Sequence, residues 1–227
     1  YLVPFGNWNQ ADRPYEQALT ETPLNLQYLY PASWRDIGVL VEGKMSMFSY
    51  SFYVGNGLKE ADYISDGQQL QDNNHDFAKG GRLALALSEY MSFGASYYEG
   101  AYDDAAERKL KLKGLDLAFI TSQWEIRGEY SKGIIGNPEG YDDGKSEGFS
   151  IWGLMSFHNF QPVASYQKMK YNDAYHGDGI ARKESRWTVG LRCTLGNSFY
   201  VKGEYAWNKE TPVLKNNVLR FQAAIAF

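Results

Sequence analysis

The chain has 227 residues, a formal net charge of −4 and one cysteine, Cys193, and no apolar run approaches the roughly 20 residues that a membrane-spanning helix needs. These features exclude helical membrane spans and an internal disulfide, and they give little support to nucleic-acid binding. The mean hydropathy of −0.49 is that of a water-soluble protein. A membrane-spanning β-strand needs an apolar side chain only at every second position, however, so its average hydropathy looks the same.

Alternation of apolar and polar residues, the pattern of a half-buried β-strand, runs along most of the chain, whereas helical periodicity is hard to find. The pattern appears in DIGVLVEGKM, FSYSFYV, GRLALALSE, WEIRGEY, WTVGLRCTL, FYVKGEYAW and the final VLRFQAAIAF. In the final segment, one face carries Leu219, Phe221, Ala223, Ile225 and Phe227. Arg220 and Gln222 lie on the other face, so we predict a closing strand with lipid on one side and water on the other.

Two segments break this pattern. In LKLKGLDLAF the phase shifts at Lys113 and Gly114, which predicts a β-bulge at that point. FQPVASYQKMKY can be read in either phase, and its Pro162 suits an edge strand or a bulge better than a central ladder. This segment stays unassigned.

The connections alternate between tight turns and long polar links. The tight turns are at 45–47, 89–91, 121–123, 158–159 and 195–198, and the links are at 7–33, 58–80, 136–145, 174–183 and 209–216, with a shorter one at 103–107. With 1–6 as the first strand, the chain has about twelve antiparallel strands in up-and-down order, and both termini lie at the short-turn end. Short turns at one end and long loops at the other are the topology of an outer-membrane barrel.

A soluble β-sandwich or barrel also alternates its faces, so the choice depends on other features. Aromatic residues mark the strand ends, as in the interfacial girdles of membrane barrels; they are Tyr97, Trp124, Tyr130, Trp187, Tyr205 and Trp207. The polar faces are rich in small residues and paired charges, which suit a water-filled lumen better than a packed core. We predict an all-β, antiparallel up-and-down transmembrane β-barrel that forms one domain, 1–227.

The inward face is expected to carry slightly more basic than acidic side chains. The eight basic residues are Lys44, Arg82, Lys111, Lys113, Arg127, Arg192, Lys202 and Arg220, and the six acidic residues are Asp36, Glu42, Asp116, Glu125, Glu129 and Glu204. An excess of two positive charges predicts a weak anion preference. The alternative is that many of them pair as salt bridges in the wall and shape the pore without selecting ions.

The first sixty residues carry a more specific pattern. It consists of Pro4-Phe5-Gly6, Arg13-Pro14, Leu19-Thr20, Trp34-Arg35-Asp36-Ile37-Gly38 and Asn56-Gly57-Leu58. In these residues the chain resembles the phosphate-selective porin O and P family of bacterial outer-membrane channels. The resemblance implies a sixteen-stranded, homotrimeric pore whose third outer loop folds into the lumen. By position, 7–33 corresponds to that loop and 1–6 to the fifth strand.

The resemblance leaves the extent of the barrel open. The chain opens on Tyr1 with no Met and no leader, so it is either a mature product or a piece of something longer. It is either a complete twelve-stranded barrel or part of a sixteen-stranded one without the first four strands. The loop 7–33 also departs from the family, because Asp12, Glu16 and Glu21 face Arg13 alone, a balance of −2. A phosphate dianion would be repelled there unless Arg13 and Arg35 converge and the carboxylates face away.

These observations predict an outer-membrane porin, a passive channel for small hydrophilic solutes or anions in which 7–33 forms the constriction. Its partners would be the lipid bilayer and lipopolysaccharide. We expect no catalytic, cofactor or metal site and no nucleic-acid partner. The residues expected to line the pore or its constriction are Arg13, Arg35, Asp36, Lys44, Arg82, Arg127, Arg192, Lys202 and Arg220.

Two alternatives remain at this level. The first is a structural or adhesive barrel whose long loops bind a partner. The second is a hydrolase at the barrel rim, which would need a nucleophile beside a base. His75, His158 and His176 lie in loops or at a turn, and no serine has a recognisable nucleophile setting. The acidic stretches 72–76 and 139–143 offer oxygen ligands without the spacing of a calcium loop, although a divalent cation there could bridge to lipopolysaccharide.

Overall fold

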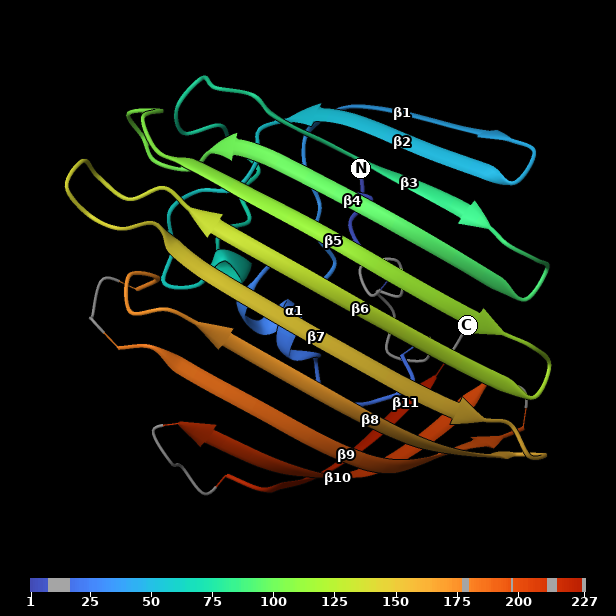
Figure 1. The fold of residues 1–227 in the computed structure, drawn as a ribbon. Helices are drawn as coiled ribbons and strands as arrows, with labels where there is room; N and C mark the ends of the chain where they lie inside the picture. Colours follow the sequence, from blue (N-terminus) through green and yellow to red (C-terminus); the bar gives the residue numbers. More distant parts are fainter. Residues whose placement is uncertain (8–16, 177–179, 197, 212–215, 226–227) are drawn as a thin grey trace.

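The computed structural model describes residues 1–7, 17–176, 180–196, 198–211 and 216–225. Eleven strands form a single antiparallel sheet in which each strand pairs with its neighbours in sequence (Figure 1). They are β1 (Gly38–Met45), β2 (Phe48–Gly55), β3 (Ala78–Ala86), β4 (Met91–Ala101), β5 (Lys109–Ile120), β6 (Trp124–Ile135), β7 (Gly144–Met155), β8 (Phe160–Tyr171), β9 (Arg182–Leu195), β10 (Phe199–Thr211) and β11 (Val218–Ile225). The helical elements are α1 (Leu24–Tyr28) and the short η2 (Ile64–Asp66). In the described part of the chain, no helix is both long and apolar enough to cross a membrane.

The up-and-down order and the sorting of connections confirm the predicted fold class. The links 46–47, 87–90, 121–123 and 156–159 join strands at one end of the sheet. The links 56–77, 102–108, 136–143 and 172–181 join them at the other end, which we call the loop side. Short and long links alternate along the sequence, so in an up-and-down sheet each kind lies at its own end. The lengths of the links were therefore enough to predict this topology.

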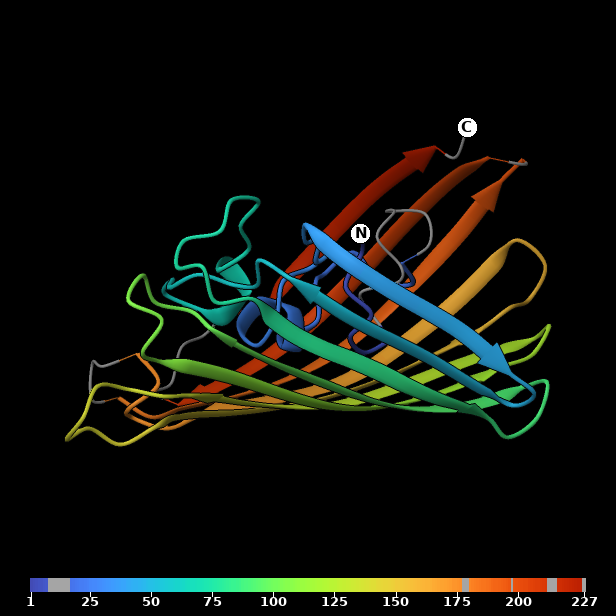
Figure 2. The same cartoon turned by 90° about the horizontal axis from the view of Figure 1, so that it is seen from above.

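The sheet is strongly curved and forms a trough, with β1 and β11 at its two edges (Figure 2). Within the described residues, β1 pairs only with β2 and β11 only with β10. The N-terminal segment and α1 lie inside the trough, on its concave side (Figure 2). The concave side is therefore occupied by chain from the first 36 residues.

The prediction of a first strand at 1–6 is wrong. This segment makes one isolated bridge, Leu2 to Arg35, and the Tyr1 ammonium donates to the backbone oxygen of Asp36 at 2.9 Å. The N-terminus consequently lies beside the loop-side start of β1 and not at the short-turn end. Val3 and Phe5 are fully buried, so their apolar surface is removed from water by packing inside the trough rather than by pairing along a sheet edge.

The convex face is apolar, as the alternation predicts. In β11, Phe221 is 74% exposed, whereas the side chains of Arg220 and Gln222 are half-buried on the concave side. The expected aromatic residues also point outward, and Trp187 pairs with Tyr166 on one side and with Trp207 on the other. Phe227 lies outside the described residues. Such a wide exposed apolar surface is far larger than a soluble protein normally shows to water.

The concave side is not uniformly polar, because its loop-side half holds an apolar core. Phe5 packs against Tyr30 with ring centroids 4.9 Å apart, and Trp34 against Tyr98 at 5.0 Å. The inward side chains of the strands complete this core near the loops. The N-terminal segment supplies three of its large rings, those of Phe5, Tyr30 and Trp34, and the strands and their links supply the others.

This core explains why the predicted bulge in β5 is wrong. The ladders on both sides of β5 are continuous through Lys113 and Gly114. Leu110 and Leu112 point into the core at 2% and 1% exposure, so Lys111 and Lys113 point outward and leave the inward tally. The alternation of the strand does not change. Near the loops its inward residues are apolar and its outward residues are lysines, whereas further along Asp116 points inward and Leu115 and Leu117 point outward.

The segment left unassigned forms β8, a regular strand between β7 and β9. Val163 and Met169 are buried on its concave side. Pro162 precedes Val163, the residue at which the pairing with β7 ends. The proline is tolerated because it lies at the end of that ladder.

The close approach of α1 to the sheet requires a glycine in β7. A Cβ at Gly148 would lie 2.2 Å from Asn25 Oδ1 and 2.8 Å from Leu29 Cδ1, whereas at Gly153 of the same strand the nearest atom, Ile126 Cγ1, is 3.8 Å away. We expect Gly148→Ala to lower the free energy of unfolding in detergent by about 1–3 kcal/mol, and Gly153→Ala to lower it much less. Equal effects of the two substitutions on thermal unfolding would contradict the tight contact with α1.

Candidate functional site

The candidate site is the polar part of the concave face together with the chain that crosses it. We call residues 17–34 the crossing segment. At the N-terminal end of the crossing segment, Glu204 of β10 accepts hydrogen bonds from the backbone N–H groups of Thr20 and Glu21 at 2.6 and 2.7 Å. Lys202 of the same strand donates to the backbone oxygen of Gln17 at 2.5 Å. Paired donors and acceptors from one strand thus fasten this end of the segment.

The middle of the crossing segment is held by β8, where Gln167 Oε1 accepts the N–H of Leu24 at 2.9 Å. On the other wall, the ring of Trp34 packs against Tyr98 of β4 with centroids 5.0 Å apart, and Ser96 of the same strand accepts the N–H of Gly6, which precedes the crossing segment, at 3.2 Å. These contacts lie on strands far apart in the sheet. The segment therefore bridges the trough instead of resting against one wall.

Glu129 of β6 holds the N-terminal segment to the sheet at a second point, through Asn7 and Tyr30. Its carboxylate is 2% exposed and accepts hydrogen bonds from Asn7 N at 2.9 Å, from Ser131 Oγ at 3.0 Å and from the Tyr30 hydroxyl. Burial, followed by the nearby Glu129 charge, raises the pKa of Tyr30 well above its usual value. The phenol therefore stays protonated and continues to donate its hydrogen bond at any physiological pH.

A cluster of charges lies where the crossing segment meets β9–β11. Glu21 forms ion pairs with Arg186 at 2.9 Å and with Arg220 at 2.7 Å, and its side chain is only 3% exposed. Arg186 also pairs with Glu184 at 3.0 Å. Two guanidinium groups thus share the Glu21 carboxylate on the loop. Neutralising Glu21 would leave both of them facing the lumen.

The remaining inward cations are distributed along the sheet. Arg82 contacts Asp116 through two hydrogen bonds of 3.1 and 2.5 Å. Arg127 pairs with Glu125 at 2.7 Å. Arg192 lies over the ring of Tyr200, 4.5 Å from its centroid. Lys44 shares the inward phase of Leu40 on the edge strand β1 and is exposed.

The structure brings together three of the nine predicted residues, Arg192, Lys202 and Arg220, on the β9–β11 wall. Arg13 lies outside the described residues. Arg35 is exposed outside the strands, where its backbone N–H donates to Gln68 Oε1 at 3.0 Å. Arg82, Arg127 and Lys44 belong to other parts of the sheet.

Asp36 is 2% exposed and accepts backbone N–H groups of Ile37, Asn56 and Gly57 at 2.7, 3.1 and 2.9 Å. Burial raises the pKa of its carboxyl, and the backbone hydrogen bonds oppose that effect. Its contacts join the start of β1 to the link that follows β2.

Sequence reasoning missed Arg186 and the role of Glu21. Arg186 has the same phase as Thr188 and Arg192, so extending the alternation of WTVGLRCTL by one residue toward the N-terminus would have placed it inward. No local signal points to Glu21, because its partners lie 165 and more residues away in the chain.

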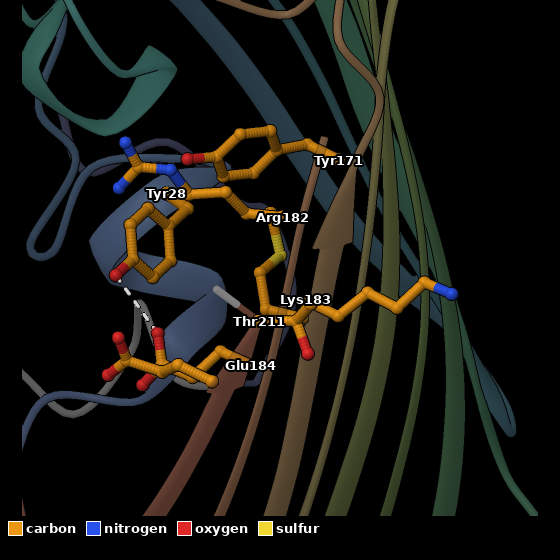
Figure 3. A pocket seen from close by; sticks show the side chains of 8 residues that line it. Tyr28, Tyr171, Arg182, Lys183, Glu184 and Thr211 are labelled. Atoms are coloured by element: carbon orange, nitrogen blue, oxygen red, sulfur yellow. Dashed lines mark hydrogen bonds between the residues drawn. The ribbon is translucent and has the colours of Figure 1, made fainter. Parts of the chain in front are cut away.

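Two hollows lie beside the crossing segment. A small one of about 40 Å³ is lined by residues of α1 and of β8–β10 (Figure 3). In it the Tyr28 hydroxyl donates to Glu184 Oε2 at 3.0 Å. A larger, open and mostly polar hollow of about 610 Å³ lies between the crossing segment and the link 56–77, next to Thr22, Gln27 and Gln68. Only the second is large enough for a hydrated solute.

His176, one of the histidines considered for a rim hydrolase, lies in a cluster of aromatic rings on the loop side. His176 packs against the rings of Tyr63, Tyr171 and Tyr175 at 4.6 to 4.9 Å. Among the residues that the structure describes, no three His, Cys, Asp or Glu side chains are placed to share a metal ion.

A curved up-and-down sheet with an apolar convex face, and with a chain segment folded across its polar concave face, defines a porin-like fold. No protein-family model matches the chain, and no curated protein matches it. Among solved structures, the chain is similar to a refined structure of a porin, with a TM-score of 0.60 and 14% sequence identity over 83% of this chain. The match covers 60% of that porin chain. At this identity the likeness is one of fold.

Proposed function

We propose that the protein is a porin of the bacterial outer membrane, a water-filled channel through which small hydrophilic solutes or ions diffuse passively. The observation that carries the proposal is the crossing segment, fastened across the concave face by side chains from both walls. A segment held in this way narrows an aqueous lumen without closing it. The apolar convex face supplies the surface that a lipid bilayer requires.

Finer properties are proposed on the same basis. Membership of the phosphate-selective porin O and P family, and the homotrimer that it implies, are supported by the motif residues of the first sixty positions. We place the constriction at 7–33, of which the crossing segment is the larger part. A structural or adhesive barrel, or a hydrolase at the rim, remains the competing class of function.

The proposed ion preference is weak and local. The outward orientation of Lys111 and Lys113 removes two cations from the expected inward excess, and the inward pair of Arg186 and Glu184 adds one charge of each sign. On the β9–β11 wall, five cations (Arg182, Arg186, Arg192, Lys202 and Arg220) face four carboxylates (Glu21, Glu184, Glu204 and Glu210), which leaves an excess of one positive charge. We propose that anions pass preferentially along this wall.

Planar-bilayer recording of the purified full chain tests the function. We expect stepwise conductance increases and, across a KCl gradient, a small reversal potential of the sign that anion flow produces. Migration in SDS gels before and after boiling provides the folding control, since a folded membrane barrel resists SDS until heated. Folded, heat-sensitive protein that gives no conductance steps would favour the structural or adhesive class, and a strong cation preference would contradict the assignment of the β9–β11 wall.

A further inference from the structure

The convex face changes character at its loop-side margin, where lysines replace apolar residues. Strand register places Lys113 beside Lys132, Lys132 beside Glu147, Glu147 beside Lys170, and Lys170 beside Lys183. We call the four lysines the lysine row. Together with Glu147 of β7, the lysine row forms a continuous line across β5–β9, and with strands about 4.8 Å apart the four steps of this line span about 19 Å.

The lysine row carries a local positive charge that differs from the rest of the chain. Four lysines and Glu147 give a balance of +3, in a protein whose net charge is −4. Acidic residues are concentrated in the neighbouring loop-side links; 136–143, between β6 and β7, contains Glu139, Asp142 and Asp143 and no basic residue. A surface that only faces water would not need this separation, since solvated faces normally mix the two signs.

Glu147 organises the row instead of neutralising it. Its carboxylate contacts Lys170 at 2.9 Å and Lys132 at 3.6 Å, while the side chains of these lysines stay 49% and 39% exposed. Lys183 and Lys170 also line a shallow hollow on this side of the sheet, together with Lys145 and Glu147. Several ammonium groups can therefore reach one anionic group from different directions.

The level of the row identifies what it meets. On β5–β7 the next residues of the same face toward the short turns are Leu115, Tyr130 and Phe149, paired side by side about 7 Å below the lysines. On β8 and β9 that level holds Lys168 and Ser185, and the apolar band begins one step further on, at Tyr166 and Trp187. In a bilayer that covers this band, the lysines lie at the headgroup level of the leaflet on the loop side, which is the outer leaflet. Clustered lysines at that level attract anionic headgroups.

We propose that the lysine row binds the phosphate groups of lipopolysaccharide in the outer leaflet. This inference depends on the proposed membrane location but not on conduction. Each phosphate would lie between neighbouring lysines, with Glu147 keeping Lys132 and Lys170 extended. The contact would hold glycolipid against the convex face of β5–β9, five consecutive strands of the sheet.

Native mass spectrometry of the detergent-solubilised full chain with lipid A tests the inference. We expect Lys170→Gln/Lys183→Gln to bind bisphosphorylated lipid A several-fold more weakly than the unmodified protein, and Lys170→Arg/Lys183→Arg to retain binding. The matched control is Lys44→Gln/Lys59→Gln, which loses the same charge away from the convex face and should bind normally. Lipid A from which both phosphates have been removed should bind weakly to all variants.

The outcome that overturns the proposal is equal binding of lipid A by the Gln variant and the control, or equal binding of the two forms of lipid A. Stronger binding of phosphatidylglycerol than of lipid A would also overturn it, because the headgroup source would then be phospholipid. Conductance in neutral-lipid bilayers separates this result from the proposed function. Protein that binds lipid A but gives no conductance retains the lysine row and loses the channel.

Discussion

Removal of both carboxylates that fasten the N-terminal segment, in Glu129→Ala/Glu204→Ala, is expected to raise the single-channel conductance about two-fold or more. Glu129 accepts the N–H of Asn7, and Glu204 accepts those of Thr20 and Glu21, at 2.6 to 2.9 Å. Each buried donor left without an acceptor costs about 1–3 kcal/mol. Release of the segment from the lumen lets these groups bond to water, and the free cross-section then increases.

The matched control for this experiment is Glu42→Ala/Glu125→Ala. It removes the same charge from inward carboxylates whose partners are Ser51 and Arg127. Limited proteolysis reports the position of the segment independently, since a released segment is cut faster. If the segment becomes sensitive to protease while the conductance matches that of the control, the crossing segment is not the constriction.

Neutralisation of the shared carboxylate in Glu21→Gln is expected to shift selectivity toward anions, with a chloride over potassium permeability ratio about two-fold higher at low salt. Glu21 lies between Arg186 and Arg220 at 2.9 and 2.7 Å, so its loss leaves two guanidinium groups with less compensation. Arg186→Gln/Arg220→Gln should move the reversal potential in the opposite direction. Both shifts should shrink as the salt concentration rises, because mobile ions screen the wall charges.

A loop pair provides the control for the selectivity experiment. Glu60 pairs with Arg108 at 2.5 Å on the exposed loop side, and Glu60→Gln changes the total charge by the same amount away from β9–β11. Equal shifts of the reversal potential for Glu60→Gln and Glu21→Gln would mean that selectivity follows the total charge of the protein, contrary to the local mechanism.

The fold was largely predictable from the sequence because strand alternation is a local property. Each strand records its own phase through the residues that it places on its two faces, and the turn residues between strands define the order. The closing strand shows this clearly: the exposed Phe221 and the half-buried Arg220 occupy the faces that the sequence predicts. The same logic failed at 1–6, since a short apolar alternation reads alike in a paired strand and in a chain packed inside the trough.

The errors in the candidate site have a related cause. Leu112 and Lys113 follow a regular alternation, yet their faces exchange roles because rings from the N-terminal segment fill the loop-side half of the trough. The prediction that assigned Lys111 and Lys113 to the lumen therefore placed both on the wrong side, and it needed a bulge to reconcile them with Asp116. On the convex face, Lys113 lies beside Lys132 and belongs to the lysine row.

The sequence by itself determined the strands, their up-and-down order, the end at which each connection lies and the phase of most side chains, because these depend on neighbours within a few residues. Only the tertiary structure decided what each face meets. Glu21 forms ion pairs with Arg186 and Arg220, and the N–H of Asn7 donates to Glu129. In each case the partners are more than a hundred residues apart in the chain. Such contacts form because the curvature of the sheet brings segments that are distant in sequence close together in space. A local pattern of residues does not indicate which distant segments become neighbours.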